Sequence, residues 1–324
     1  MLKDISYYKT GGTCQSLVQP KSIEELSQAV QELSKKSIPY YVLGGGTNSL
    51  VSDEFWKGAV INLNYMTNME ILDSHQVKAE GGVDNTDFAK FALKHELEGC
   101  AWMNRLPGQI GGTTRMNAKC YGGEISQIVI EVTTVGPTGE IHKYSHDRQN
   151  PIFRGYKDTI FMDRKDSDII ASVICQLKPG NYPDIESLMI HCESDRVSKG
   201  QFTYPSCGCV FKNNYAVGVP SGMLLDQAEA HDLGTKDAFL NPKHANFVFN
   251  RSAGSREIIE LTLKMRDRVY QRFGVWLEYE MEILGHLPED LKHAIGESKA
   301  NNFDEEALKP LRASFQKKQS DSKT

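Results

Sequence analysis

Two glycine-rich segments constrain the fold of this chain more than any other feature of its sequence. The first runs from Gly44 to Ser49 and follows a short apolar run, residues 40–43, that is typical of a buried strand. Glycines after such a strand expose several backbone N–H groups, which together can bind phosphate oxygens. The segment is not a Rossmann fingerprint, because the G-x-G-x-x-G spacing fails at its last position and a strand, 58–61, is expected where the phosphate-binding helix should begin. Alone, it indicates a tight turn as readily as a phosphate site.

The second glycine-rich segment extends from Arg105 to Ala118 and continues to Glu124, and it contains five glycines, one proline and Asn117. It lies between expected strands. Two glycine-rich loops that also carry hydroxyl and amide side chains suit a dinucleotide that lies extended across a sheet, with its pyrophosphate bound by backbone N–H groups. The two segments together therefore predict a dinucleotide site.

The periodicity of the chain indicates an α+β fold. One well-specified helix starts at Ser22, which is expected to form a capping box with Glu25. A long amphipathic helix is expected at 255–273, with Gly274 as its C-cap. The residues after 286 are polar and are expected to form a helical or disordered tail. Further strands are expected at 77–82, 131–135, 141–144, 169–177 and 245–249, and further helices at 84–91 and from 181 to about Ser194.

Composition excludes several classes of protein. The 324 residues carry a net charge of −5 without a basic block, which argues against a nucleic-acid partner. The sequence contains no segment typical of a membrane span or a signal peptide, so a cytoplasmic protein without a membrane partner is expected. The seven cysteines are scattered and odd in number, which favours free thiols over a disulfide framework.

The segment 204–213 is the clearest candidate for chemistry, because it sets Cys207 and Cys209 on either side of a glycine and Lys212 shortly after. A glycine lets the backbone approach a ligand, and a thiol that is mostly protonated at neutral pH can donate a proton to a reacting carbon. Two other interpretations stay open, namely a pair of thiols buried in the core and part of a zinc site with residues 191–192. The spacing matches no four-ligand zinc pattern, so no metal site is predicted.

Six blocks of sequence, in order, resemble the UDP-N-acetylenolpyruvoylglucosamine reductase family, which has the older name UDP-N-acetylmuramate dehydrogenase. The resemblance covers about residues 5–285, and the tail after His286 lies outside it. The compact spacing between Phe161 and Arg196 resembles the shorter of the family's two types. The blocks are Leu43-Gly-Gly-Gly-Thr-Asn-Ser-Leu-Val-Ser-Asp53, Arg105-x-Pro-Gly-x-Ile-Gly-Gly with Asn117 and Tyr121-Gly-Gly-Glu124, Gly155-Tyr156, Pro205-Ser-Cys-Gly-Cys-Val-Phe-Lys-Asn213, His244-Ala-Asn and Phe273-Gly-Val-Trp-Leu-Glu-x-Glu280.

The resemblance implies a fold and a reaction. It implies a FAD-binding α+β unit of the vanillyl-alcohol-oxidase type, a smaller α+β substrate-binding domain and a polar tail. In the family, NADPH reduces a non-covalently bound FAD, and the reduced flavin passes hydride to the enolpyruvyl group of UDP-N-acetylglucosamine enolpyruvate, which gives UDP-N-acetylmuramate for peptidoglycan synthesis. The expected ranges are 1–180 for the FAD-binding unit, with subdomains of about 1–65 and 66–180, then 181–285 for the substrate-binding domain and 286–324 for the tail.

The resemblance also implies a nucleotide-sugar substrate. A monomer is expected, with a weak homo-oligomer as the alternative. Two alternatives are kept. One is a flavin-binding paralogue that has lost catalysis and serves a binding or regulatory role, which is motivated by departures from the family pattern such as Lys119 in place of a usual glycine. The other is an oxidase on the same flavin scaffold, which would show fast reoxidation of its reduced flavin by oxygen.

The reaction sets requirements for side chains. Hydride that arrives at the terminal carbon of an enol ether leaves negative charge spread from the adjacent carbon into its carboxylate, and that carbon must then be protonated. By matching position, Cys209 falls where the family has a serine as proton donor, and Glu280 falls on the family's catalytic glutamate, which helps to stabilise the enol. Lys157 falls where the family usually has an arginine that engages the substrate carboxylate. A lysine offers a point charge in place of a planar fork, so Arg154 is a candidate to compensate.

The resemblance assigns binding residues as well. The substrate contacts that it implies are Tyr156, Lys199, Lys212 and Asn213, where lysines suit a diphosphate and asparagine suits directional hydrogen bonds. The FAD contacts that it implies are Gly44, Gly45, Gly46, Thr47, Asn48, Ser49, Pro107, Gly108, Gly111, Gly112, Asn117 and Gly122.

Overall fold

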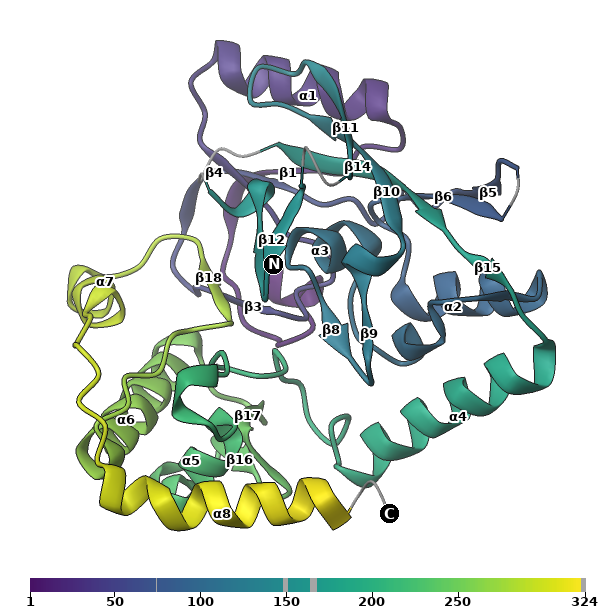
Figure 1. Cartoon of the computed structure of the whole chain (residues 1–324). Coiled ribbons are helices and arrows are strands. Elements are labelled where there is room, and N and C mark those ends of the chain that lie inside the picture. The colour runs from purple at the N-terminus through teal and green to yellow at the C-terminus, as the bar shows by residue number, and fades with distance from the viewer. Residues whose placement is uncertain (74, 148–150, 164–167, 322–324) are drawn as a thin grey trace. The chain divides into compact units, whose positions relative to one another are not determined.

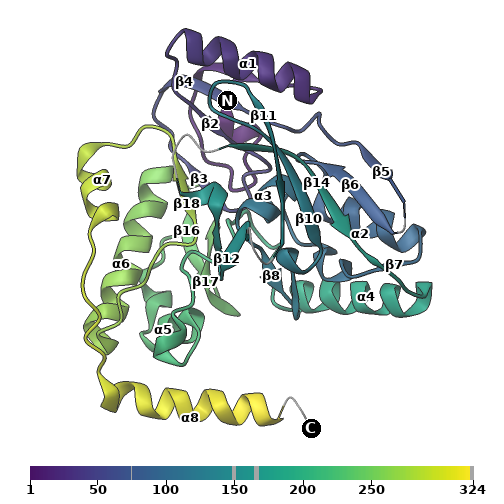
Figure 2. The ribbon, with the colours of Figure 1, turned by 45° about the horizontal axis from the view of Figure 1, so that its top comes forward.

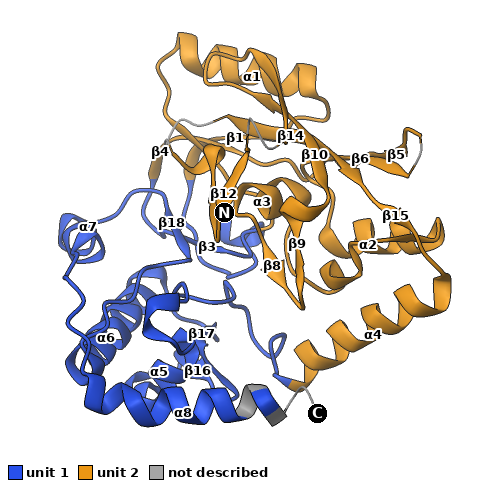
Figure 3. Cartoon of the chain, viewed as in Figure 1, with its two compact units in different colours: residues 1–13, 46–55, 199–324 blue, residues 14–45, 56–198 orange. Residues whose placement is uncertain are grey.

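The computed structural model describes residues 1–73, 75–147, 151–163 and 168–321. The chain forms two compact units, and each is assembled from separate stretches of sequence (Figure 3). Unit 1 contains residues 1–13, 46–55 and 199–324, and unit 2 contains residues 14–45 and 56–198. The first glycine-rich segment is divided between the units after Gly45. The domain ranges expected from the sequence are consecutive stretches, and they stay a prediction.

Unit 2 begins with a three-stranded parallel sheet that one helix covers. Helix α1 (Ile23–Lys35) starts where predicted, and the Ser22 hydroxyl oxygen accepts a hydrogen bond from the Glu25 N–H at 3.2 Å. The reciprocal bond of the predicted capping box does not form, because the Glu25 carboxylate accepts from the Lys21 N–H instead. The strand order of the sheet is β1 (Cys14–Val18), β4 (Trp56–Ile61) and β2 (Tyr40–Val42).

A five-stranded antiparallel sheet forms the rest of the framework of unit 2 (Figures 1 and 2). Helices α2 (Asn85–Lys94) and α4 (Tyr182–Ser198) pack their apolar side chains against it, and the buried face of α1 contacts its strands β10 and β14 as well as β4. The expected hairpin around Pro137 is present as β10 and β11. The strand order is β11 (Ile141–Ser145), β10 (Val129–Val135), β14 (Ile169–Gln176), β6 (Gln76–Glu80) and β5 (Met69–Ile71).

Short elements of unit 2 carry the second glycine-rich segment and its neighbours. Helix α3 (Ile110–Arg115) lies inside that segment. The paired short strands are β7 (Leu97–Glu98) with β15 (Lys178–Pro179), β8 (Lys119–Cys120) with β9 (Gly123–Glu124), and β12 (Phe153–Gly155) with β13 (Asp158–Thr159). Single 3-10 turns are Ala101–Met103, Ile125–Gln127 and Ile160–Met162.

Unit 1 joins segments that are far apart in the sequence. Strand β3 (Ser49–Val51) pairs in parallel with β18 (Glu282–Leu284), and the fully buried Tyr8 donates its hydroxyl hydrogen bond to the Val248 carbonyl at 3.0 Å. The N-terminal residues therefore belong to the same core as the C-terminal half. The remaining strands and 3-10 turns are β16 (Ala238–Asn241), β17 (His244–Asn250), Leu2–Asp4, Tyr215–Val217 and Ala230–Leu233.

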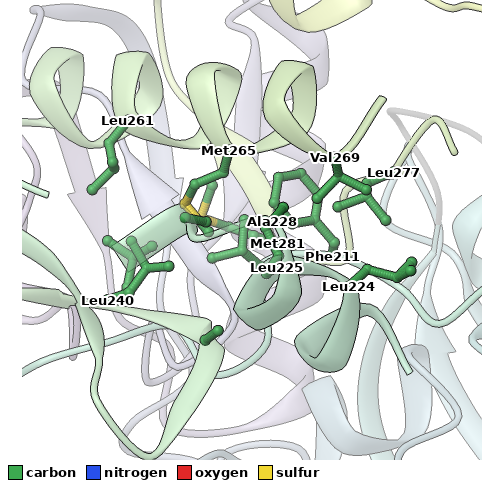
Figure 4. Close-up of a cluster of buried hydrophobic side chains, with 14 of the residues drawn as sticks. Phe211, Leu224, Leu225, Ala228, Leu240, Leu261, Met265, Val269, Leu277 and Met281 are labelled. Carbon is green, nitrogen blue, oxygen red and sulfur yellow. The ribbon is translucent and has the colours of Figure 1, made fainter. Parts of the chain in front are cut away.

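The core of unit 1 forms around helix α6 (Ser255–Phe273), whose bounds match the predicted helix and which ends at Gly274 with φ +64°. The spacing of its apolar residues places them on one face. That face packs against helix α5 (Ser221–Gln227) and against apolar side chains of residues 210–211 and 275–281 (Figure 4). The side chains labelled in that view are Phe211, Leu224, Leu225, Ala228, Leu240, Leu261, Met265, Val269, Leu277 and Met281.

The segment after residue 286 is helical, one of the two states expected for it. It contains α7 (Glu289–Gly296) and α8 (Glu305–Asp321), and residues 322–324 of the expected tail lie outside the described residues. Among the residues that the structure describes, no helix is both long enough and apolar enough to cross a membrane.

Candidate active site

In unit 2 the second glycine-rich segment is fixed by backbone hydrogen bonds to the turn after β6. The Gly108 carbonyl accepts from the Asn85 N–H at 3.0 Å, and the Gly111 N–H donates to the Gly81 carbonyl at 2.9 Å. These bonds hold the half-buried Pro107 and its neighbours against the sheet. The local conformation of the segment is thus set by the protein itself.

The first glycine-rich segment meets the second one in unit 2. The buried Asn62 side chain donates to the carbonyls of Leu43 and Gly44 at 2.6 and 3.3 Å, which fixes the end of β2. A Cβ atom on Gly44 would lie 2.8 Å from Oε1 of Gln109, whose Nε2 donates to Asn64 at 2.7 Å. Gln109 was not among the predicted site residues, although it stands inside the quoted motif between Gly108 and Ile110.

Three residues of the second segment offer a ligand either open space or a polar atom. Gly112 and Gly122 are exposed, and a Cβ atom on either would meet no heavy atom of the described chain within 4 Å. The buried Asn117 donates to Glu124 at 2.7 Å and to the Gly155 carbonyl at 2.9 Å, while its Oδ1 accepts no hydrogen bond within the described part of the chain. A buried acceptor without a donor is costly, so a ligand N–H or O–H that supplies one stabilises the site.

Tyr156 and Lys157 form the turn of the β12–β13 hairpin, because Gly155 lies opposite Asp158. Both side chains are half-buried, and Lys157 has φ +54°. The pKa of the Cys120 thiol is raised by burial, and the positive charges of Arg196 and Lys157 oppose that rise. The hairpin that carries Lys157 is connected to the second glycine-rich segment, because Nδ2 of Asn117 donates to the Gly155 carbonyl at 2.9 Å.

Arg154, the candidate to compensate for the missing arginine, is paired with two carboxylates. Its guanidinium binds Asp163 through Nη1 at 2.7 Å and Asp158 through Nε at 3.2 Å, and Nη2 also donates to the Thr159 carbonyl at 3.0 Å. These hydrogen bonds raise the pKa of Arg154, since they favour its charged form. The role of Arg154 as a second cation for the substrate stays a prediction, and its two acidic partners would compete with an anionic substrate group.

In unit 1 the Cys-Gly-Cys segment runs between two strand-like neighbours. On one side Cys209 pairs with Phe247, and the Asn246 side chain accepts from the Phe211 N–H at 3.0 Å and donates to the Phe211 carbonyl at 2.8 Å. These two hydrogen bonds fix the backbone of Phe211, two residues after Cys209. Asn246 lies in the His244-Ala-Asn block, but no site role was predicted for it.

On the other side the same segment pairs with the chain around Glu280. The Glu280 N–H donates to the Val210 carbonyl at 2.9 Å, and Phe211 pairs with Tyr279. Asn48 joins this arrangement, because its Nδ2 donates to the Glu280 carbonyl at 3.0 Å. Thus Asn48 from the first glycine-rich segment, Glu280 and the residue after Cys209 are connected by direct hydrogen bonds within unit 1.

The remaining first-segment residues of unit 1 lie beside Asn48. The half-buried Thr47 precedes it, and Ser49 begins β3 opposite Glu282. Gly46 has φ +66°, and a Cβ atom there would lie 2.9 Å from Cα of Ser6. Gly46 is thus required by close packing as well as by its backbone conformation.

The two thiols of the Cys-Gly-Cys segment differ. Cys207 is 1% exposed, and burial raises its pKa far above the ordinary range, with further contributions from the neighbouring Cys209 and Glu280. Its interaction with the Tyr8 hydroxyl adds a polar contact inside the core. Cys209 is half-buried. The core-thiol interpretation therefore applies to Cys207, and Cys209 is the thiol with access to a ligand.

Two of the predicted substrate residues of unit 1, Lys212 and Asn213, lie at the start of α5. The Ser221 N–H donates to Oδ1 of Asn213 at 2.9 Å, and the Ser221 hydroxyl donates to the Lys212 carbonyl at 2.5 Å. Burial and the charge of Lys199 lower the pKa of His244, whose ring lies 3.4 Å from the Cβ position of Gly222. Lys212 and Asn213 thus lie beside this helix start, and the half-buried His244 is a neighbour there.

Among the described residues, no group of three or more His, Cys, Asp or Glu side chains is placed to hold a metal ion. All seven cysteines are free thiols.

Two family models match the chain, and together they span both glycine-rich segments and the Cys-Gly-Cys segment. A FAD binding domain matches residues 14–145, and the C-terminal domain of UDP-N-acetylenolpyruvoylglucosamine reductase matches residues 200–284. The expected α+β fold class, a FAD-binding unit followed by a second domain, is confirmed by these matches and by a related solved structure.

Curated relatives named UDP-N-acetylenolpyruvoylglucosamine reductase are similar to this chain along most of its length. The protein of Treponema denticola is 33% identical over 296 residues, which cover 88% of this chain and 92% of the relative. The protein of Clostridioides difficile is 32% identical over 286 residues, which cover 88% of this chain and 91% of the relative. The crystal structure of the reductase of Thermus caldophilus has 28% sequence identity and a TM-score of 0.71, and it covers 87% of this chain and 97% of that one.

Proposed function

Because the chain belongs to the UDP-N-acetylenolpyruvoylglucosamine reductase family, we propose that it reduces the enolpyruvyl group of UDP-N-acetylglucosamine enolpyruvate to UDP-N-acetylmuramate, a step of peptidoglycan precursor synthesis. It is a flavoenzyme with FAD as its cofactor and NADPH as its reductant. The observation that carries the proposal is the pairing in unit 1 that sets the residue after Cys209 against Glu280. A cytoplasmic location and a monomeric state are further predictions.

Residues of the two glycine-rich segments would hold the flavin. Gly112 and Gly122 leave room beside the backbone, and Asn117 offers an unpaired oxygen. Gly44 of the first segment lies against Gln109, the residue before α3 in the second segment. Bound FAD, once reduced by NADPH, supplies the hydride for the substrate.

The side chains of the protein then have to stabilise the negative charge and supply a proton. Cys209 donates its S–H proton to the carbon next to the one that received hydride, which quenches the negative charge there. Glu280 helps to stabilise the enol intermediate that exists before this proton is transferred. Lys157 holds the substrate carboxylate, and Lys199, Lys212, Asn213 and Tyr156 bind the rest of the nucleotide sugar.

An anaerobic titration of the purified protein tests the proposal. NADPH is added first, and the yellow flavin absorbance is expected to bleach. UDP-N-acetylglucosamine enolpyruvate is added next, and the absorbance is expected to return. Bleaching without recovery would contradict the proposed substrate, and rapid recovery with oxygen alone would indicate an oxidase.

The Cys209→Ala variant tests the proton donor. We expect bleaching by NADPH at the wild-type rate and a recovery phase slowed by a factor of about 10² to 10⁴, because only the second half-reaction needs the proton. Cys14→Ala is the matched control, since Cys14 is also a half-buried free thiol. Unchanged recovery in Cys209→Ala would refute the assignment.

A further inference from the structure

The C-terminal extension, residues 285–321, lies beyond the matched C-terminal domain, which ends at residue 284. Its helices nevertheless belong to the core of unit 1. Leu291, Leu308 and Leu311 are 4%, 0% and 8% exposed, and they pack in the same apolar cluster as α6. Residues that bury this much apolar surface stabilise the fold rather than form a loose tail.

The linker between α7 and α8 binds the turn that leads to Glu280. The Asn302 N–H donates to the Gly274 carbonyl at 2.8 Å, and Oδ1 of Asn301 accepts from the Trp276 N–H at 2.7 Å. A Cβ atom on Gly274 would lie only 1.6 Å from the Asn302 carbonyl oxygen. The linker therefore contacts the backbone of this turn directly.

A buried arginine continues this connection to the residue before Glu280. Arg266 is 3% exposed, and its Nη2 donates to the Ala294 carbonyl at the end of α7 at 2.7 Å. The same guanidinium lies 4.1 Å from the ring centre of Trp276 and 5.3 Å from that of Tyr279. The extension thus contacts the Glu280 segment through both backbone and side-chain groups.

Helix α8 makes a second contact, to the loop that follows Asn213. Arg312 donates from Nε to the Val217 carbonyl at 2.8 Å, and its ion pair with Glu305 at 2.5 Å orients the guanidinium. In Figures 1 and 2, α8 runs beside α5, the helix that this loop enters. The loop ends at Ser221, which itself binds Lys212 and Asn213 through its hydroxyl and its N–H.

We propose that the C-terminal extension is a brace for the candidate active site. Arg312 is a positioning residue that sets Lys212 and Asn213 through the loop, and Asn301 is a positioning residue for the segment that carries Glu280. The kinetic part of this inference rests on the proposed function, because it uses the roles assigned there. The mechanical part rests only on the contacts within unit 1.

Hydrogen exchange on the full-length protein tests the mechanical part. Arg312→Ala is expected to increase exchange at residues 214–221, and Asn301→Ala at residues 275–281, because each variant removes a hydrogen bond that holds the segment. Lys309→Ala is the matched control, since Lys309 is an exposed cation on α8. Exchange in both variants equal to that of Lys309→Ala would overturn the brace.

Steady-state kinetics separate positioning from general stability. Arg312→Ala is expected to raise KM for the nucleotide sugar about tenfold with kcat within about twofold, and Arg312→Lys to recover part of the loss. Asn301→Ala is expected to lower kcat about fivefold at unchanged KM. Equal changes of both parameters in both variants would overturn the positioning roles. An inactive wild type would refute the proposed function, while the exchange experiment would still decide the brace.

Discussion

The two glycine-rich segments use glycine for different reasons. In the first, the space that a side chain would need is filled by the protein, as the contact of the Gly46 Cβ position with Ser6 shows. In the second, a Cβ atom on Gly112 or Gly122 would meet no described atom within 4 Å, although one on Gly123 would lie 2.1 Å from the Trp102 ring. A glycine motif thus combines positions where the fold leaves no room for a side chain with open positions, which are the candidates for contact with a ligand. Only the structure separates them, and substitutions can test that separation.

The largest effect is expected for Gly46→Ala. The new methyl group would clash with Ser6 at 2.9 Å, and φ +66° is unfavourable for alanine. We expect the free energy of unfolding to fall by roughly 2–4 kcal/mol, from left-handed strain of about 1 kcal/mol and overpacking of about 1–3 kcal/mol. Urea unfolding measures it. A loss below about 1 kcal/mol would mean that the first segment is less constrained than the geometry indicates.

Gly112→Ala is expected to act on the flavin and to leave the fold intact. Gly112 lies within α3, where alanine is favoured over glycine by up to about 1 kcal/mol, so the stability of the apoprotein should stay constant or rise. The affinity for FAD should fall about tenfold, because the methyl group occupies the room beside the backbone. Fluorescence titration of the apoprotein measures the affinity. Wild-type affinity would remove Gly112 from the flavin site.

Gly122→Ala sharpens the comparison, because Gly122 has the same open surroundings but φ +78°. Strain without overpacking should lower the free energy of unfolding by about 1 kcal/mol, well below the effect at Gly46. Urea unfolding of both variants under identical conditions provides the test. A loss at Gly122 as large as that at Gly46 would show that conformation, rather than packing, dominates at both positions.

The smallest effect is expected for Glu124→Gln, and it should depend on pH. Burial raises the pKa of Glu124, but hydrogen bonds from Ser126, Lys119 and Asn117 outweigh this and lower it from its ordinary value of 4.5. A lowered pKa in the folded state contributes stability above pH 4.5, and this contribution disappears as the pH falls through the folded-state pKa. We expect a loss of about 0.5–1 kcal/mol at pH 7.

Urea unfolding of Glu124→Gln at a series of pH values measures this dependence. The difference from wild type should shrink at pH values below 4.5, where the carboxylate becomes protonated. A difference that stays constant with pH would show that the charge of Glu124 does not stabilise the second segment.

Local signals in the sequence predicted the helices well. The helix at 255–273 was predicted with its bounds, because its apolar period and Gly274 lie within the element itself. The pairing of β3 with β18 was not predicted, since Leu50 and Val51 form too short an apolar run to specify a partner. Burial of the C-terminal extension was missed for a related reason. Its few apolar residues stand among charged ones, and only the packing against α6 shows their role.

In the candidate site, too, individual residues were predicted from the sequence, whereas their contacts with distant residues were not. The resemblance selected Cys209 and Glu280, but nothing in the sequence between them shows that their segments pair. The ion pairs of Arg154 with Asp158 and Asp163 were not predicted, because the turn that brings these carboxylates to its guanidinium is a feature of the folded hairpin. Asn246 was missed as well. Its side chain binds both the N–H and the carbonyl of Phe211, and such a contact with a distant residue leaves no pattern in the neighbouring sequence.

Unit 1 is assembled from three separate stretches of the chain, and this has a consequence for its folding during synthesis on the ribosome. Tyr8 leaves the exit tunnel early, yet its core neighbours, including Val248, are translated only after all of unit 2. At ordinary elongation rates the delay is on the order of ten seconds. Unit 2 has time to form first, whereas the N-terminal residues must wait with apolar side chains exposed. Nascent chains should therefore bind chaperones through residues 1–13 until the last third of the protein has emerged.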